Sequence, residues 1–327
     1  MAETLITVPQ QALAEMRLAP PSKVGDRLFK WLTMIMGLSV GVLIVLVGFT
    51  LWRGAAPSVH HFGPRFLTSS TWDPVQEVFG ALPFIYGTLV SSLIGLVIAV
   101  PLSIGTAVFL TELAPPRLRQ PIVSVIEMLS AVPSVIFGLW GIFVLIPWLR
   151  VHLFPSLQKL FGFLPLFQGP NYGVSMLAAG IIIAIMILPI ITSVSREILR
   201  SVPDLQREAA YALGATRWEV TRIAVLSYAK RGLFGAVVLG LGRALGETMA
   251  VTMLIGNRPE ISASLLAPGY TLASVIANEF SEATTDLYLS ALFEIGLVLF
   301  GVTILTNALA QLLIASTAGP KTSRAVQ

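Results

Sequence analysis

The chain has 327 residues, of which 55% are hydrophobic and only 12% are charged, and its mean hydropathy is +0.83. Soluble domains carry about 25% charged residues, so this composition excludes a water-facing surface over most of the molecule and indicates an integral membrane protein. The chain has no cysteine and no GxxxxGK[ST] phosphate loop, which excludes disulfides, thiolate catalysis and ATP hydrolysis by the chain itself.

Six apolar stretches are long enough to cross a bilayer, which requires about 20 mostly apolar residues per helix. The pattern predicts an all-α, polytopic membrane protein with a transmembrane domain over residues 32–314 and a long cytoplasmic loop at about 195–231. Residues 1–31 are polar for longer than the charged start of a secretory signal, so we expect a retained anchor and not a cleaved leader. The predicted spans are about Leu32–Trp52, Phe84–Leu110, Ile122–Trp148, Gly173–Val194, Leu233–Ile255 and Tyr288–Ile314.

The Lys and Arg residues outside these spans are unevenly distributed. Fifteen lie in the N-terminal segment 1–31, the second and fourth connections and the tail 315–327, whereas five lie in the other connections. Basic residues accumulate on the cytoplasmic side of membrane proteins, so we expect both termini to be cytoplasmic. This topology accounts for the net charge of +4 without a nucleic-acid partner.

Four prolines, Pro101, Pro133, Pro147 and Pro189, fall inside or near the ends of predicted spans, where proline kinks helices. Together with the glycines they suggest a pathway that opens and closes. The alternative is that Gly and Pro are simply more frequent in membrane helices.

The long connection between the fourth and fifth spans carries the signals of two short helices. Pro203 and Asp204 suit the first turn of a helix, and Gly214 suits its C-terminal end. Thr216 and Glu219 match a capping box at the start of a second helix. The pattern predicts a helix–Gly–helix elbow, and the alternative is an amphipathic loop lying on anionic lipid.

The stretch LGLGRALGETMAV places Arg243 and Glu247 inside the fifth predicted span. A charge at mid-depth costs at least ~2.5–3.5 kcal/mol. Because helical residues four apart project from nearly the same face, each charge can partly neutralise the other. One interpretation is a buried structural ion pair that fixes helix packing. The other makes Arg243 an anion-binding residue, since its guanidinium fork matches phosphate oxygens, with Glu247 moderating release.

The segment EAAYALGATRWEVTRIAVLSYAK, Glu208–Lys230, resembles the EAA loop of bacterial ABC importer permeases. The residues that match the family pattern in place are Glu208, Ala209, Ala210, Gly214 and Leu226. Ala224 stands where Ile is usual and Ser227 where Pro is usual, which softens the exit of the second helix but leaves the elbow intact. In that family the loop docks on a separate ATPase subunit.

The resemblance narrows to permeases of phosphate-specific importers and spans most of the chain, from about Gly25 to Ala310. It is carried by the stretches Phe79–Ser92, Phe109–Pro115, Glu127–Gly141 and Leu239–Asn257. The later segment ANEFSEA, Ala277–Ala283, and the early N-terminal span favour one of that importer's two permease subunits over the other.

The resemblance implies a type I ABC importer permease fold for a chain that is not an enzyme but a permease subunit of an ATP-driven phosphate importer in the bacterial cell (inner) membrane. The implied partners are a second permease subunit, a cytoplasmic ATPase dimer, a periplasmic or lipid-anchored phosphate-binding protein, inorganic phosphate and membrane lipid. The implied substrate-pathway residues are Arg243 and Glu247, and the implied coupling-loop residues are Glu208, Ala209, Ala210 and Gly214.

Two alternatives stay open. One keeps the mechanism but changes the cargo to sulfate, molybdate or another oxyanion. The other is a stand-alone secondary transporter or channel in which Arg243 and Glu247 relay protons or ions, although such a carrier has no need of a docking elbow. We expect no catalytic residue and no cofactor. We also expect no metal site, because the three histidines lack carboxylates at metal-ligand spacing.

Overall fold

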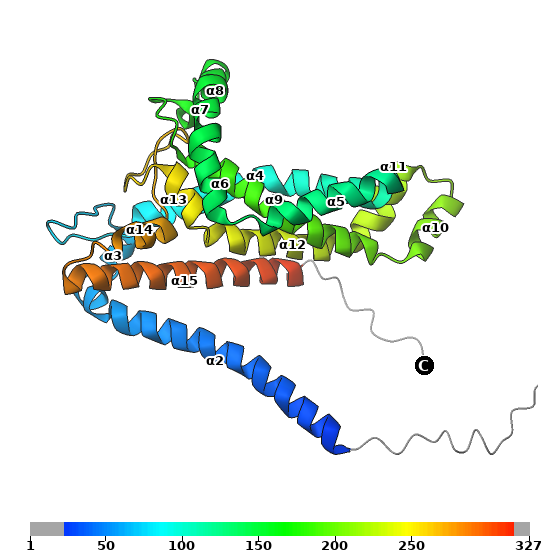
Figure 1. Ribbon diagram of the computed structural model, residues 1–327, viewed down its shortest axis with the longest axis horizontal. Coiled ribbons are helices and arrows are strands. Elements are labelled where there is room, and N and C mark those ends of the chain that lie inside the picture. Colours follow the sequence, from blue (N-terminus) through cyan, green and yellow to red (C-terminus); the bar gives the residue numbers. More distant parts are fainter. Residues whose placement is uncertain (1–22, 317–327) are drawn as a thin grey trace, which may run out of the picture. The chain divides into compact units, whose positions relative to one another are not determined.

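The structure is a computed structural model that describes residues 23–316, and in this range it is built from helices, with a single β-bridge between Asp73 and Val78. Six of the helices are long and apolar enough to cross a membrane (Figure 1). Their number agrees with the six predicted spans, and the all-α fold class is confirmed. Most of the predicted terminal segments, 1–31 and 315–327, lies outside the described residues.

The chain divides into two compact units. The first unit comprises residues 1–50, and its described part is the apolar beginning of α2. The second unit, residues 51–327, contains the end of α2 and the remaining elements. The elements in chain order are α2 (Lys23–Phe62), α3 (Arg65–Thr68), α4 (Leu82–Val108), η1 (Phe109–Leu113), α5 (Pro116–Ala131), α6 (Ser134–Trp140), η2 (Gly141–Leu145), α7 (Ile146–Trp148), η3 (Leu149–Leu153), α8 (Phe154–Phe161), η4 (Pro165–Phe167), α9 (Met176–Arg200), α10 (Asp204–Ala212), α11 (Arg217–Val220), η5 (Thr221–Leu226), α12 (Ser227–Leu245), α13 (Met249–Ile255), α14 (Leu272–Glu279) and α15 (Asp286–Ser316).

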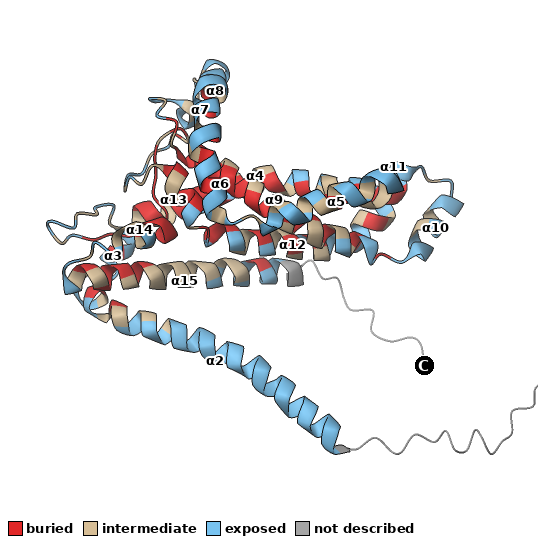
Figure 2. Cartoon of the chain, viewed as in Figure 1, coloured by how far each residue is buried: buried red, intermediate tan, exposed pale blue. Residues whose placement is uncertain are grey.

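Helix α9 is the centre of the second unit, and Figure 2 shows it as one of the most buried helices. It packs against α4 and α12 through small residues that let the backbones approach closely. A Cβ added at Gly95 of α4 would lie 2.6 Å from Ile183 Cγ2, and one added at Gly180 of α9 would overlap Ile94. The α4–α9 contact therefore depends on glycine on both sides.

The third span is predicted as one continuous helix over Ile122–Trp148. This prediction is wrong, because the helix breaks at Pro133. Helix α5 ends at Ala131, the next two residues have extended backbone, and a new helix starts at Ser134. Proline donates no N–H and disfavours helical backbone in the preceding residue, which explains the break. From there the helix continues through α6, η2, α7, η3 and α8 to Phe161, at a steep angle to α4, α9 and α12 (Figure 1). The helix is not interrupted at the other three prolines singled out above.

The fifth predicted span, Leu233–Ile255, also differs. Its helix begins earlier, at Arg217, runs through α11, η5 and α12, and then breaks over Gly246–Thr248 before α13. Glycine has a low helix propensity, and α13 packs against α6, where a Cβ added at Gly138 would overlap Met253. The helices that follow the two breaks, α6 and α13, are therefore neighbours.

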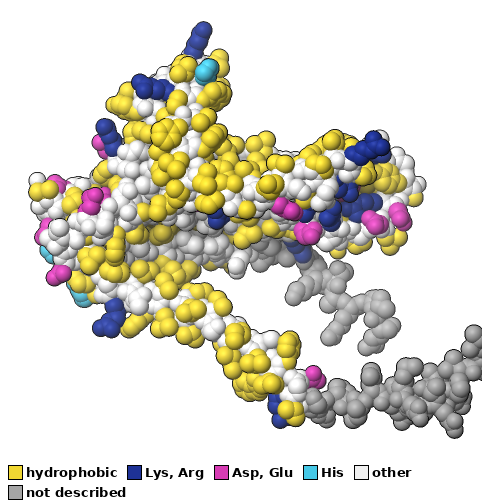
Figure 3. All heavy atoms as spheres, in the orientation of Figure 1, with side chains coloured by type: hydrophobic (Ala, Val, Ile, Leu, Met, Phe, Trp, Pro, Cys, Tyr) yellow, Lys and Arg dark blue, Asp and Glu magenta, His cyan; other side chains and the backbone are white. Residues whose placement is uncertain are grey.

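The charged side chains of the second unit gather toward the ends of its helices. On the face shown in Figure 3, Lys and Arg are concentrated around α10 and α11, and hydrophobic side chains cover most of the helices between the ends. An apolar band between two charged zones is the surface that a bilayer requires.

The close α4–α9 contact can be tested on a single helix. Gly95→Val is expected to destabilise the chain by about 1–3 kcal/mol, because the added side chain overpacks against Ile183. Gly105→Val is the matched control, since it lies on the same helix and a Cβ there meets nothing within 4 Å. The measurement is thermal unfolding of the purified, detergent-solubilised chain, and equal transition temperatures for the two variants would contradict this account of the contact.

Candidate functional site

The break between α12 and α13 holds a buried carboxylate. Glu247 is 9% exposed, and its carboxylate interacts with the backbone N–H groups of Thr248 and Ala250 and with the hydroxyl of Ser134. Ser134 is the first residue of α6, so the beginnings of two helices meet at this carboxylate. Helix beginnings carry partial positive charge, which offsets part of the cost of burying the Glu247 carboxylate.

Arg243 lies in the last turn of α12, where the negative end of the helix dipole favours a cation. Its side chain is exposed, and none of the ion pairs found within residues 23–316 includes it. Arg243 attracts Glu247 at longer range. The predicted one-turn spacing of the two residues on a single helical face is wrong, because the helix ends between them. This arrangement does not fit a buried structural ion pair.

Arg243 lines an open cavity of ≈ 450 Å³ between α9, α12 and α15. The remaining wall is apolar or small except for one amide side chain, and it consists of Ile190, Gly235, Val238, Leu239, Gly242 and Asn307. A guanidinium presents several N–H groups that match an anion with several oxygens. Arg243 as an anion-binding residue stays a prediction.

The predicted elbow is present, and Gly214 forms its bend. Gly214 has φ +81°, a backbone conformation that glycine adopts without strain. Its N–H bonds to the carbonyl of Tyr211 at 2.9 Å, and the N–H of Ala215 bonds to the carbonyl of Ala210 at 3.2 Å. These two bonds are a Schellman motif, which satisfies the last carbonyls of α10.

The second half of the elbow begins with the predicted capping box. Thr216 and Glu219 exchange hydrogen bonds between side chain and backbone, which starts α11. Most of the surface of the elbow is exposed, including the family-pattern residues Glu208, Ala209 and Gly214, while Ala210 is half-buried. The large apolar side chains that it leaves exposed are Leu205, Tyr211, Leu213 and Trp218.

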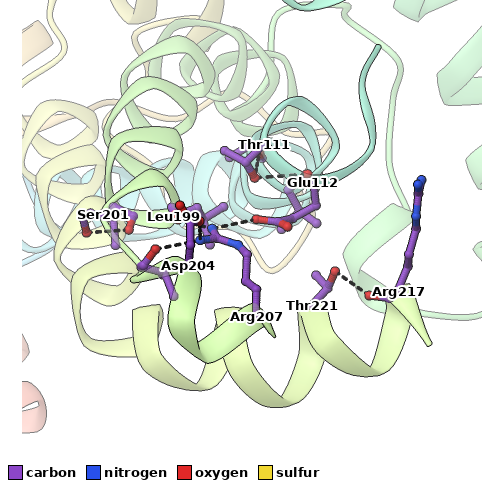
Figure 4. A network of polar contacts seen from close by, with 12 residues as sticks. Thr111, Glu112, Leu199, Ser201, Asp204, Arg207, Arg217 and Thr221 are labelled. Carbon is purple, nitrogen blue, oxygen red and sulfur yellow. Dashed lines mark hydrogen bonds and ion pairs between the residues drawn. The ribbon is translucent and has the colours of Figure 1, made fainter. Parts of the chain in front are cut away.

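Arg207 fastens α10 to the membrane helices (Figure 4). Its guanidinium donates to the backbone carbonyls of Leu199 and Val202, at 3.0 and 2.7 Å. It also pairs with Glu112 of η1 at 3.0 Å and with Asp204 at 3.1 Å. The Arg207 and Glu112 side chains are only 17% and 13% exposed, whereas Asp204 is 87% exposed. The pair with Glu112 is therefore the shielded one.

Sequence reasoning assigned no role to Arg207 or Glu112. They lie 95 residues apart, and no spacing rule connects positions so distant. Two weak signals were present: Glu112 is an acid at the end of the second predicted span, and Arg207 directly precedes the EAA pattern. Only the folded chain brings the two together.

Glu294, a second acid inside a membrane-spanning helix, has a hydrogen-bond partner within the chain. It is 6% exposed and accepts a hydrogen bond of 2.5 Å from the Ser58 hydroxyl. Among residues 23–316 no group of three or more His, Asp or Glu side chains is placed to hold a metal ion.

Comparison with known families and proteins gives a consistent result. Residues 99–318 match the family described as "Binding-protein-dependent transport system inner membrane component". The protein named "Phosphate transport system permease protein PstC" from Mesorhizobium japonicum is 48% identical over 293 residues, which cover 88% of this chain and 90% of that protein. The protein of the same name from Pasteurella multocida is 47% identical, with 88% and 91% covered. A "Probable phosphate transport system permease protein PstC" from Methanocaldococcus jannaschii is 36% identical, with 85% and 90% covered.

Among solved structures, the chain is similar to one from the MetNI methionine ABC transporter, in its inward-facing CY5 native crystal form. The TM-score is 0.54 at 18% identity, and the match covers 76% of this chain and 100% of that chain. At this identity the similarity concerns the fold alone. This chain therefore shares the fold of a chain from an ABC transporter.

The bend at Gly214 is open to a direct test. Gly214→Val is expected to open the Schellman motif, because a side chain at positive φ costs about 1–2 kcal/mol. A Cβ at this position would meet nothing within 4 Å, so the effect is one of backbone conformation alone. Gly214→Asn is the control, since asparagine tolerates this conformation better. Hydrogen exchange of the α10 amides should be faster in the valine variant than in the asparagine variant, and equal rates would contradict the assignment.

Proposed function

The chain belongs to the family of binding-protein-dependent transport system inner membrane components, and we propose that it is the permease subunit of an ATP-driven importer for inorganic phosphate. The observation that carries the proposal is the 47–48% identity, over almost nine-tenths of the chain, to proteins named phosphate transport system permease PstC. The exposed guanidinium of Arg243 in its apolar cavity supplies the chemistry that this cargo needs.

Phosphate loses part of its water shell on the way across a membrane, and an anion in an apolar environment is costly unless a cation faces it. Arg243 offers two N–H groups in the geometry of two phosphate oxygens. Glu247 is held in the adjacent break and keeps the net positive charge near the cavity small. Phosphate is therefore bound firmly enough to enter and weakly enough to leave.

We infer that ATP hydrolysis takes place on a separate subunit, because this chain has no phosphate loop. The elbow is the docking surface for that ATPase, with Glu208, Ala209, Ala210 and Gly214 as its coupling residues and an exposed apolar set beside them. Movement of the elbow tilts the membrane helices, so that the pathway opens alternately to the two sides.

The remaining partners follow from the same proposal. They are a second, PstA-like permease that completes the pathway, a PstB-like ATPase dimer in the cytoplasm, and a PstS-like phosphate-binding protein that is periplasmic or lipid-anchored. The chain resides in the bacterial cell (inner) membrane with both termini in the cytoplasm, and it carries out no chemical reaction itself.

Importers of sulfate or molybdate are the second candidate function, because a guanidinium binds any tetrahedral oxyanion. Competition of these anions with labelled phosphate uptake distinguishes the two cargos. A stand-alone secondary transporter or channel is disfavoured, since it would need neither the elbow nor its exposed apolar side chains.

The topology is tested with single cysteines, which are the only thiols in a chain without cysteine. Ser70→Cys, at an exposed position before α4, should react with a membrane-impermeant thiol reagent in intact cells. Ser201→Cys, at an exposed position between α9 and α10, should react only after the membrane is permeabilised. The opposite result would invert the orientation and remove the elbow from the cytoplasm.

The role of Arg243 is tested by removing both charges at once. Arg243→Gln with Glu247→Gln should lower labelled-phosphate uptake by about ten- to a hundred-fold, because hydrogen bonds to a charged group contribute about 1.5–3 kcal/mol. Arg243→Lys keeps the charge but loses the fork, so uptake should fall less. Arg150→Gln removes an exposed guanidinium elsewhere and is the control. Full uptake by the double variant, normalised to assembled complex, would leave Arg243 without a role in binding phosphate.

A further inference from the structure

We propose that the ion pair between Arg207 and Glu112 is the joint through which movement of the elbow reaches the membrane helices. The two are positioning residues that do not touch the cargo. This inference rests on the proposed function, because it names the contact by which the ATPase-driven movement is transmitted.

Apart from its packing on η5, helix α10 has few contacts that hold it. None of its residues is buried, and it is joined to α9 by the three residues Ser201–Pro203. Within residues 23–316, the side-chain hydrogen bonds that leave α10 all start at Arg207. Without this side chain, α10 would keep only its packing on η5 and its chain connections.

The contacts of Arg207 differ in whether they can pass a movement of α10 to another helix. The carbonyls of Leu199 and Val202 belong to the end of α9 and the turn after it, so these bonds hold α10 to its own chain neighbours. Asp204 lies on α10 itself and is solvent-exposed. Glu112 lies on η1, at the end of α4. The bond to Glu112 is therefore the one that connects the elbow with a distant helix.

The joint is stiff because both charges are shielded from water. A partly buried ion pair is costly to break when one partner remains, since the other charge is left without compensation. The guanidinium is also fixed by its further bonds to carbonyls, so it has little freedom to follow one partner and release the other. Displacement of α10 then displaces η1.

From η1 the displacement has a path to the break beside Glu247. Leu110 of η1 packs on Val123 of α5, and Arg119 of α5 donates to the carbonyl of Thr111 at 3.2 Å. Helix α5 has 16 residues and is about 24 Å long at 1.5 Å per residue. Its far end is followed by Pro133 and by Ser134, whose hydroxyl interacts with Glu247. One end of α5 thus meets the joint, and the other meets the candidate phosphate site.

The test uses the whole complex, with ATPase and binding protein, reconstituted in proteoliposomes, and it measures phosphate uptake and ATP hydrolysed per phosphate. Glu112→Gln and Arg207→Gln should each raise the ATP used per phosphate by about two- to thirty-fold, the range of couplings of 0.5–2 kcal/mol. The double variant should be no worse than either single variant, because both remove the same contact. Asp204→Asn, which alters only the exposed partner of Arg207, should behave like wild type.

If the Glu112→Gln complex hydrolyses as much ATP per phosphate as the wild-type complex, the proposed role of the ion pair is wrong. Additive effects of the two substitutions in the double variant would contradict it as well. If Glu112→Gln fails to assemble, Glu112→Cys with Arg207→Cys replaces it in this cysteine-free chain. Bridging the two thiols with a short bifunctional reagent should restore coupling, and a bridged but uncoupled complex would overturn the joint. Absence of uptake by the wild-type complex would instead contradict the proposed function, so the two failures are distinguishable.

Discussion

Lipid offers no hydrogen bonds, so each backbone polar group and each charge in a membrane-embedded chain has to find its partner inside the protein. This constraint explains why the described residues are almost entirely helical. It also explains how the two breaks are tolerated: the helices that follow them pack together, and Glu247 accepts from N–H and hydroxyl groups that the breaks release. Arg243 is the exception, because no acid on this chain pairs with it within the described residues. This is why we propose an anion as its partner.

Features controlled by neighbouring residues were predictable from the sequence. The length of each apolar stretch predicted six spans, and the elbow followed from Gly214, Thr216 and Glu219, whose preferences act within one helical turn. The choice of Glu247 and Arg243 as candidate site residues also needed only hydropathy, because a charge inside an apolar stretch stands out.

Features controlled by distant contacts were not predictable. Pro133 ends a helix, whereas Pro101 and Pro189 do not, and the sequence around each proline does not reveal the difference. The break after Arg243 depends on how α13 packs against α6, which no periodicity records. The joint between Arg207 and Glu112 requires α4, α9 and α10 to be folded together first. Local sequence preferences therefore predict that a helix forms, whereas tertiary contacts determine the residue at which it ends.

The hydrogen bonds that form the bend at Gly214 and the capping box after it lie between residues 210 and 219. Since these bonds are local, the bend at Gly214 keeps its form when the arrangement of the membrane helices changes. Mutations on its outer face can then accumulate to suit a different ATPase without altering how the helices pack, and the cavity at Arg243 can change its cargo without altering the elbow. Energy source and cargo are in this sense separate modules of one chain, free to evolve at different rates.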